Sequence, residues 1–408
     1  MYRFLLTMAL FGGFTTELLA LGFRNPDQGA RATGQGEAFV AQADDASAIY
    51  YNPAGLTQLE GTHVTSGGYL VFRDIQFSGA GGSDKLDDPA LTPHLYLATD
   101  FGQEKWRFGF GATVPFGNEM DWGDGPFSLI VRQSSLVVFN FQPTVAYQLN
   151  EHLSLGVGLN IYHGDTELEF DFSPFLPGSR SKFEGDGQAV GAIVGLLWKI
   201  NEQHAIGVVY RSPFAIDFEG QAQNTGAGLF TTSASASAEI DFPQQVAVGY
   251  AFRPTKKLKL EVDVDWTNWD TLNVVTLQTA DPIIAADPRT TIPFNWLDSF
   301  YYEVGAQYDI NDHWVARAGY IFSENSVPTS TFSPNLPDAD RHVFSVGVGF
   351  DSKEPVIGKI SVVVEITYQY ALSEDRTIPT GASAASPFVD GNWESRSHAV
   401  IITSTLRF

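Results

Sequence analysis

The segment ISVVVEITYQY, residues 360–370, alternates apolar with polar or small side chains along most of its length. Its polar positions include Glu365 and Gln369. Because successive side chains of a strand point to opposite faces of a sheet, one face of this segment is apolar and the other is mostly polar. Residues 399–408, AVIITSTLRF, repeat the pattern and end on the aromatic residue Phe408. The end of the chain is therefore predicted to form two long strands.

The same alternation recurs through the chain, for example in residues 137–147, 258–267 and 300–310. A water-soluble barrel would show it with the opposite sense, and alternation alone does not separate the two. Asp263 and Asp265 lie in mid-strand, where they suit a polar lumen. Tryptophans stand near predicted strand ends, as aromatics do at a lipid interface: Trp198, Trp266, Trp296 and Trp314. Together these features favour a transmembrane barrel.

The first twenty residues have the pattern of a cleaved export signal. Arg3 supplies a positive start, residues 4–14 are uncharged and largely apolar, and Ala20 ends a tolerable cleavage site. The apolar run is too short to cross about 30 Å of hydrocarbon as a helix. No other stretch approaches 18 consecutive apolar residues, so strands are expected to make any membrane insertion.

Composition is typical of a bacterial outer-membrane protein. The 408 residues include 39 Gly, 31 Phe, 15 Tyr and 8 Trp, which suits strands, turns and interfacial aromatics. There is no Cys, which excludes thiol catalysis and disulfides. The formal net charge of −23 argues against nucleic acid as a partner, and we interpret the acidity as solvated loops and a polar lumen. No linker divides the chain, so we expect one large closed sheet of the all-β class.

Short and long connections alternate along the chain. The short polar turns are residues 102–105, 150–152, 201–203, 253–257, 311–313 and 351–358. The long loops, rich in Gly, Pro and Asp, lie near residues 79–90, 117–132, 173–184, 220–231, 280–295, 325–340 and 373–394. This predicts an antiparallel barrel of 14 strands over residues 63–408, with short periplasmic turns and long extracellular loops. The last strand would close against the first, and Phe408 would be recognised by the barrel assembly machinery.

Residues 21–62 lack clean alternation and are rich in small residues, so they can pack inside a lumen. This segment resembles the N-terminal hatch of the FadL/TodX family of outer-membrane transporters, and above all in NPAGL at residues 52–56. Further matches follow in family order: residues 91–93, 106–117, 146–158, 266–269, 326–328 and 337–341. The resemblance covers roughly 380 residues.

The resemblance implies a monomeric 14-stranded barrel plugged by residues 21–62, which carries long-chain fatty acids or small aromatic hydrocarbons across the outer membrane. It also implies a kink in the third strand that lets substrate leave sideways into the membrane. The sequence has no recognisable box for energy coupling, so we expect diffusion down a gradient. Expected surroundings are outer-membrane lipid and lipopolysaccharide.

Three groups of residues are candidates for this task, each with a structural alternative. Residues expected to capture substrate outside, or else to pack loops together, are Trp122, Phe127, Leu129, Ile130, Phe175 and Leu176. Residues expected to gate the hatch, or else to form a turn, are Asn52, Pro53, Ala54 and Gly55. Residues that interrupt the third strand, as a lateral gate or a harmless strand end, are Gly109, Gly111 and Pro115.

A fatty acid needs a cation for its carboxylate, because burying an unpaired charge is costly. The candidates are Arg107, Arg317 and Arg341, of which the first two face the lumen by parity and the third stands in a family-like motif. Neighbouring acids could equally pair with these arginines, so aromatic and alkane substrates stay open.

An enzyme is the least favoured class. His163 and Asp165 are the nearest approach to a base and its orienting acid, and no Ser stands in a nucleophile context. No His pair has metal-ligand spacing and no phosphate loop is present, so we expect no catalytic residues, metal or cofactor. The serious alternative is a nonspecific porin or a structural or adhesive outer-membrane protein, and a porin would need an open lumen.

Overall fold

The computed structural model describes residues 22–79, 82–87, 89–356 and 358–408. The predicted signal peptide therefore lies outside the described residues. The strands of the wall, in chain order, are β1 Thr62–Gly79, β2 Gly82–Leu86, β3 Pro89–Thr99, β4 Trp106–Asp121, β5 Gln133–Gln148, β6 Leu153–Asp171, β7 Arg180–Lys199, β8 His204–Arg211, β9 Phe214–Thr225, β10 Thr231–Phe242, β11 Gln245–Phe252, β12 Leu258–Thr267, β14 Gln278–Thr279, β16 Ser299–Asp309, β17 Trp314–Ser323, β18 Arg341–Asp351, β19 Ser361–Ser373, β20 Arg376–Ile378 and β21 Gly391–Arg407.

Other elements lie inside the wall or in its long loops. The N-terminal segment contains α2 Ala30–Thr33, α3 Ala48–Tyr51 and the 3-10 helix η1 Pro53–Gln58. The loops contain η2 Trp269–Thr271, β13 Val274–Thr276, α4 Pro282–Ala285, η3 Pro288–Thr290, β15 Thr291–Pro293 and η4 Thr329–Thr331. No helix in the described part of the chain is long and apolar enough to cross a membrane.

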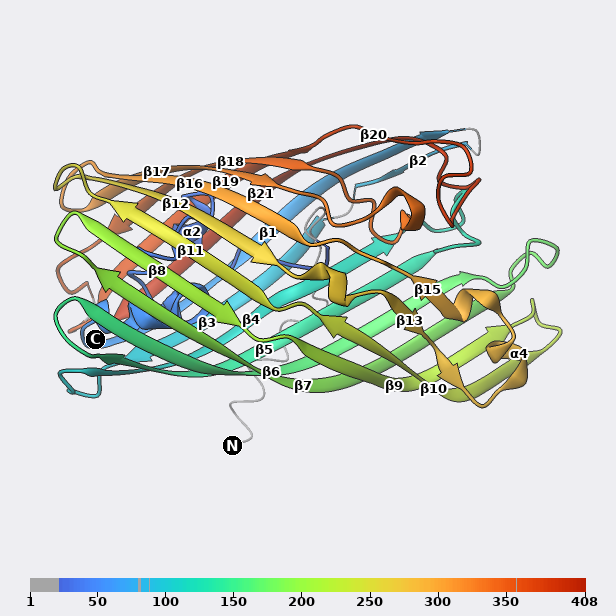
Figure 1. The fold of residues 1–408 in the computed structure, drawn as a ribbon, viewed down its shortest axis with the longest axis horizontal. Helices are drawn as coiled ribbons and strands as arrows, with labels where there is room; N and C mark the ends of the chain where they lie inside the picture. The colour runs from blue at the N-terminus through green and yellow to red at the C-terminus, as the bar shows by residue number, and fades with distance from the viewer. Residues whose placement is uncertain (1–21, 80–81, 88, 357) are drawn as a thin grey trace.

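The wall closes into an antiparallel barrel of 14 strands, as predicted. The first and last strands pair over their whole length, from His63↔Arg407 to Gly79↔Gly391. Some strands of the barrel consist of two pieces in sequence: β7 pairs with β8 at one end and with β9 at the other. The tilt and length of the strands make a tall barrel (Figure 1).

In the part of the chain that the structure describes, the predicted short turns lie at one end of the barrel and the long loops lie at the other (Figure 1). The predicted loop bounds were too wide, because several strands continue outward: β4 to Asp121, β7 from Arg180 and β9 to Thr225. The β6–β7 ladder extends to Asp171↔Arg180. Continuous backbone pairing therefore outweighs the Gly, Pro and Asp content that suggested loops.

Near the short turns the wall is apolar outside and polar inside, the sense expected in a membrane. In β12, Val262 and Val264 are exposed (49% and 44%), whereas Asp263 between them is 2% exposed. Trp198 and Trp314 are exposed near this end, as interface aromatics should be. Trp296 does not belong to this group: it is buried inside the barrel at the other end, so its assignment to the interface was wrong.

Toward the long loops the sense reverses. In β9, Ile216 and Phe218 are buried, while Asp217 and Glu219 are exposed. This end of the wall is apolar inside and polar outside, like a soluble barrel. We call the apolar interior at this end the upper chamber, and the polar interior at the short-turn end the lower lumen.

Candidate functional site

Residues 22–61, the hatch, fill the lower lumen and are tied to opposite sides of the wall. Arg24 pairs with Asp265 of β12 at 2.5 Å, and Arg31 pairs with Glu365 of β19 at 3.0 Å. Asp263 of β12 accepts hydrogen bonds from the backbone N–H groups of Phe39 and Val40, each at 2.9 Å. Acids that sequence reasoning placed in a polar lumen therefore hold the hatch.

Asp44 is the hatch acid with the densest set of cations around it. It pairs with Lys259 at 2.6 Å and with Arg31 at 3.0 Å. Burial alone would raise the pKa of Asp44, but the two cations hold it well below its usual value. The carboxylate therefore stays charged and links the hatch to β12.

Asn52 connects three parts of the molecule and is fully buried. Its side-chain amide donates to Val40 O of the hatch at 2.7 Å and to Leu196 O of β7 at 3.1 Å. Its side-chain oxygen accepts from Ala54 N at 3.1 Å and caps η1, in which Pro53 occupies the first turn. The turn at residues 52–55 is thus a structural crosslink, and its role as a gate stays a prediction.

Glycines allow this turn to approach other backbone closely. A Cβ at Gly55 would stand 2.2 Å from Ala43 O, and one at Gly195 of β7 would stand 2.2 Å from the side-chain oxygen of Asn52. Real side chains do not approach so closely, so larger residues at either position would displace the hatch.

The third strand of the barrel, β4, is irregular where the sequence predicted. Its pairing with β5 passes from Thr113↔Asn140 to Phe116↔Val138, so two residues, the second being Pro115, oppose one. On its other edge β4 pairs with β3 only as far as Ala112↔Leu95. Within the described residues, β3 and the outer half of β4 are therefore split apart.

The start of the hatch occupies this split. Asn25 N donates to Pro115 O at 2.8 Å, and Gly117 N donates to Phe23 O at 2.7 Å. Residues 23–25 thus take the place of a strand beside β4. Gly109 and Gly111 have a different role from the predicted interruption, because a Cβ at either would come within 3.0 Å of Ile49 of the hatch. They permit close packing of the hatch on the wall.

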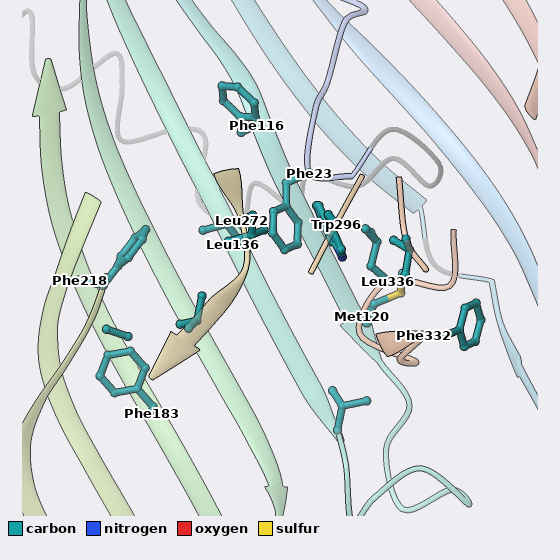
Figure 2. Close-up of a cluster of buried hydrophobic side chains, with 14 of the residues drawn as sticks. Phe23, Phe116, Met120, Leu136, Phe183, Phe218, Leu272, Trp296, Phe332 and Leu336 are labelled. Carbon is teal, nitrogen blue, oxygen red and sulfur yellow. The ribbon is translucent and has the colours of Figure 1, made fainter. Parts of the chain in front are cut away.

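An apolar cavity of about 140 Å³ lies in the upper chamber. The Phe23 ring closes one side of it, with its centre 4.9 Å from that of Trp296. Figure 2 shows Phe23 between Leu136 and Trp296, with Phe183 farther along the chamber. The cavity therefore lies directly above the segment that covers the split.

The predicted capture residues do not form one exposed patch. Trp122 and Phe127 are buried, where the Phe127 ring stacks on Trp393 at 5.2 Å and the Trp122 indole N–H donates to Pro334 O at 2.9 Å. Their assignment to an exposed landing surface was wrong, because the loops fold over each other. Of the six residues Phe175 is the most exposed, at 93%, whereas Leu129, Ile130 and Leu176 are half-buried.

The three predicted arginines face inward but do not line the cavity. Arg107 donates to backbone carbonyls near the short turns, including Gln103 O at 3.0 Å. Arg317 pairs with Glu365 at 2.8 Å, and Arg341 donates to Ser397 at 3.0 Å. All three side chains crosslink parts of the barrel, and Arg317 does so by pairing with an acid, which was the structural alternative.

Sequence reasoning missed Arg289, which does line the cavity. It follows Asp287 and Pro288 in a predicted loop, and its guanidinium lies 4.3 Å above the Phe170 ring. Burial would raise the pKa of Asp287, but the adjacent Arg289 holds it below its usual value. The Asp-Pro pair is a turn signal, whereas the contacts of Arg289 to distant loops leave no local signal.

The family described as outer membrane protein transport proteins (OMPP1/FadL/TodX) matches residues 13–408. A putative outer membrane protein of Neisseria meningitidis serogroup B is 26% identical, over 94% of this chain and 93% of its own length. The long-chain fatty acid transport protein of Escherichia coli K12 is 22% identical, over 84% and 86%.

Two solved structures show the same fold. A FadL homologue from Pseudomonas aeruginosa has a TM-score of 0.84 at 18% identity, covering 95% of this chain and all of that one. The toluene transporter TodX of Pseudomonas putida has a TM-score of 0.70 at 16% identity, covering 97% and 100%. The family consists of transport proteins rather than enzymes. Because the family match covers nearly the whole length of this chain, the chain belongs to the OMPP1/FadL/TodX family of outer membrane transport proteins.

Proposed function

We propose that the protein carries hydrophobic small molecules, long-chain fatty acids or aromatic hydrocarbons, passively across the outer membrane. The placement of Phe23 carries this proposal. Its ring closes the apolar cavity, while its carbonyl accepts from Gly117 N beside the split in the wall. One short segment therefore separates a binding chamber from an opening toward lipid.

The polarity of the interior supports a sideways exit. Below the cavity a solute would meet a lumen filled by ionic contacts such as Arg24–Asp265 and Arg31–Glu365. A hydrophobic solute gains no transfer free energy by entering this polar lumen. It does gain favourable transfer free energy by entering lipid. The split between β3 and β4 offers that path once residues 23–25 move aside.

Deleting Pro115 tests the lateral exit. Without it, one residue of β4 would oppose one of β5, which removes the irregularity between Thr113 and Phe116. We expect a folded barrel with greatly reduced uptake. Deleting Gly123, a partly exposed residue just after β4, is the control, and normal uptake by the Pro115 deletion would overturn the lateral route.

Uptake by intact cells tests the transport function itself. Cells with and without the gene are given labelled oleate and labelled toluene. A loss of uptake of either solute without the gene supports the proposal. Equal uptake of both solutes by the two strains would overturn it.

Conductance tests the alternative of a nonspecific porin. The hatch is fixed to the wall by buried ion pairs and by Asn52, so we expect no steady ion current from purified protein in planar bilayers. A steady current would favour the porin.

A further inference from the structure

In the described part of the chain, few charged side chains line the cavity, and none of them is free to bind a charged ligand. Three charged residues are among those that line it: Glu167, Lys182 and Arg289. The side chains of Glu167 and Lys182 lie on the outward rows of β6 and β7, where they pair with each other at 2.9 Å and Lys182 also pairs with the exposed Glu184 at 2.5 Å. Lys182 is therefore neutralised by acids of β6 and β7. Among the described residues that line the cavity, this leaves Arg289 as the one cation that could face a ligand.

Arg289 has no donor to spare. A guanidinium carries five N–H donors. Two of them go to the carboxylate of Asp287, at 2.9 and 2.6 Å. The others go to backbone carbonyls of Leu129, Asp171 and Phe172, at 3.2, 2.7 and 2.9 Å.

A bound carboxylate would have to displace these partners. Displacing Asp287 would leave one carboxylate unpaired for each one gained, and displacing the carbonyls would unseat two loops. Because a buried charge without a partner is costly, either exchange disfavours an anionic ligand. Among the described residues that line the cavity, no cation is therefore free to receive the head group of a fatty acid.

The size of the cavity points the same way. It measures about 140 Å³ and is bordered largely by apolar side chains such as Leu136, Phe294 and Trp296. An apolar protein cavity of roughly 150 Å³ is known to stay dry and to bind benzene. A long alkyl chain would fit only by displacing Phe23 or its neighbours, whereas a single ring fits as the cavity stands.

We propose that the upper cavity takes a neutral, ring-sized hydrophobic solute and rejects carboxylates, because Asp287 and three backbone carbonyls saturate Arg289. This rests on the proposed transport function and narrows its substrate class. Asp287 is the specificity-determining residue, since it neutralises the one cation that could receive an acid.

Competition binding to the full-length protein in detergent tests the inference. Labelled toluene is bound first, and unlabelled toluene or decanoate is then added. We expect toluene to compete and decanoate to compete at least tenfold more weakly. Decanoate that competes within twofold of toluene would overturn the inference, while labelled uptake by cells would still support transport.

A charge variant tests the cause. Asp287→Asn keeps an oxygen that can accept from Arg289 N but removes the charge that neutralises the guanidinium. We expect the affinity ratio to move toward decanoate by about tenfold, the value of one charge-assisted hydrogen bond. Asp281→Asn is the matched control, because Asp281 also precedes a Pro and caps α4 through Ile283 N and Ile284 N.

The two failures are distinguishable. An unchanged ratio in Asp287→Asn, or an equal change in Asp281→Asn, would overturn the role of Asp287. If neither toluene nor decanoate binds, and cells without the gene take up both labelled solutes normally, the proposed transport function itself fails.

Discussion

The lower lumen and the upper chamber are built from the same strands by opposite rules. In the lower lumen, inward side chains such as Asp263 and Glu365 are polar and find partners in the hatch. In the upper chamber, inward side chains such as Phe183 and Ile216 are apolar and find one another. In the lower lumen, hydrogen bonds and ion pairs fix the hatch in place. In the upper chamber, apolar packing leaves a cavity that favours apolar solutes.

The contrast is visible along the single strand β7. Its outward row runs from Lys182, Glu184 and Asp186 near the long loops to Val194 and Trp198 near the short turns. Strands rise about 3.3 Å per residue, so the 20 residues of β7 are longer than a bilayer requires. The chamber therefore stands above the hydrocarbon, and the hatch lies at the level of the membrane.

Breaking the plug should have the largest effect. Arg24→Ala leaves the buried Asp265 without its partner, which costs about 3–5 kcal/mol of hatch docking. We expect ion current in planar bilayers from this variant and none from the native protein. Replacing both residues, as Arg24→Met with Asp265→Leu, should restore much of the closure. A closed single variant would show that the ion pair does not hold the hatch.

Packing of the upper chamber comes next. Phe127→Ala should destabilise the long loops by about 3–5 kcal/mol, because the ring is fully buried against Trp393. Phe175→Ala should change stability by less than about 0.5 kcal/mol, since its side chain is exposed. Limited proteolysis of the loops compares the two. Similar protease sensitivity in both variants would contradict the buried position of Phe127.

A smaller effect is expected at the junction of plug and wall. Asn52→Ala removes hydrogen bonds to Val40 and Leu196 and should cost about 1–3 kcal/mol. Hydrogen exchange of the hatch should rise while the barrel still assembles. Uptake should change if the turn gates transport, and unaltered exchange and uptake would leave Asn52 without either role.

The smallest effect should be a pH dependence of one loop. Burial raises the pKa of Asp338 to about 6, against the opposing effects of its backbone hydrogen bonds from Ser326 and Ala339 and of Arg376. A raised pKa means that the protonated form is favoured in the folded loop, so its stabilisation is lost as pH rises through about 6.

Protease protection of residues 325–340 should therefore be higher at pH 4 than at pH 7. Asp338→Asn imitates the protonated side chain and should flatten this dependence. An equal pH dependence in the variant would assign the effect to a group other than Asp338.

Much of the wall could be predicted, because alternation is a local signal. Glu365 and Gln369 turned inward as the pattern required, and short turns marked one end of the barrel. The irregularity at Pro115 was also visible, since proline cannot donate to a ladder. The NPAGL segment identified the hatch through family resemblance rather than through geometry.

The upper chamber could not be predicted to the same degree. Aromatic residues such as Trp122, Trp296 and Phe127 occur both at lipid interfaces and in loops, so their type does not predict burial. They are buried here by contacts with loops that are distant in the sequence. Arg289 meets carbonyls more than 100 positions away, so no local pattern reveals that its donors are saturated. Long-range contacts therefore separate the predictable wall from the unpredictable site.

The reversed polarity of β9 and β10 has a consequence for how the barrel is inserted. Their exposed acids, Asp217, Glu219, Glu239 and Asp241, lie toward the long loops, which we predict to be extracellular, so these acids would have to pass from the periplasm to the cell exterior. Moving this many charged side chains through the hydrocarbon of the bilayer costs a large free energy. We expect this hairpin to cross before the wall closes, so that insertion intermediates should shield residues 214–242 from lipid-soluble labels. Labelling of these residues during insertion would contradict that order of events.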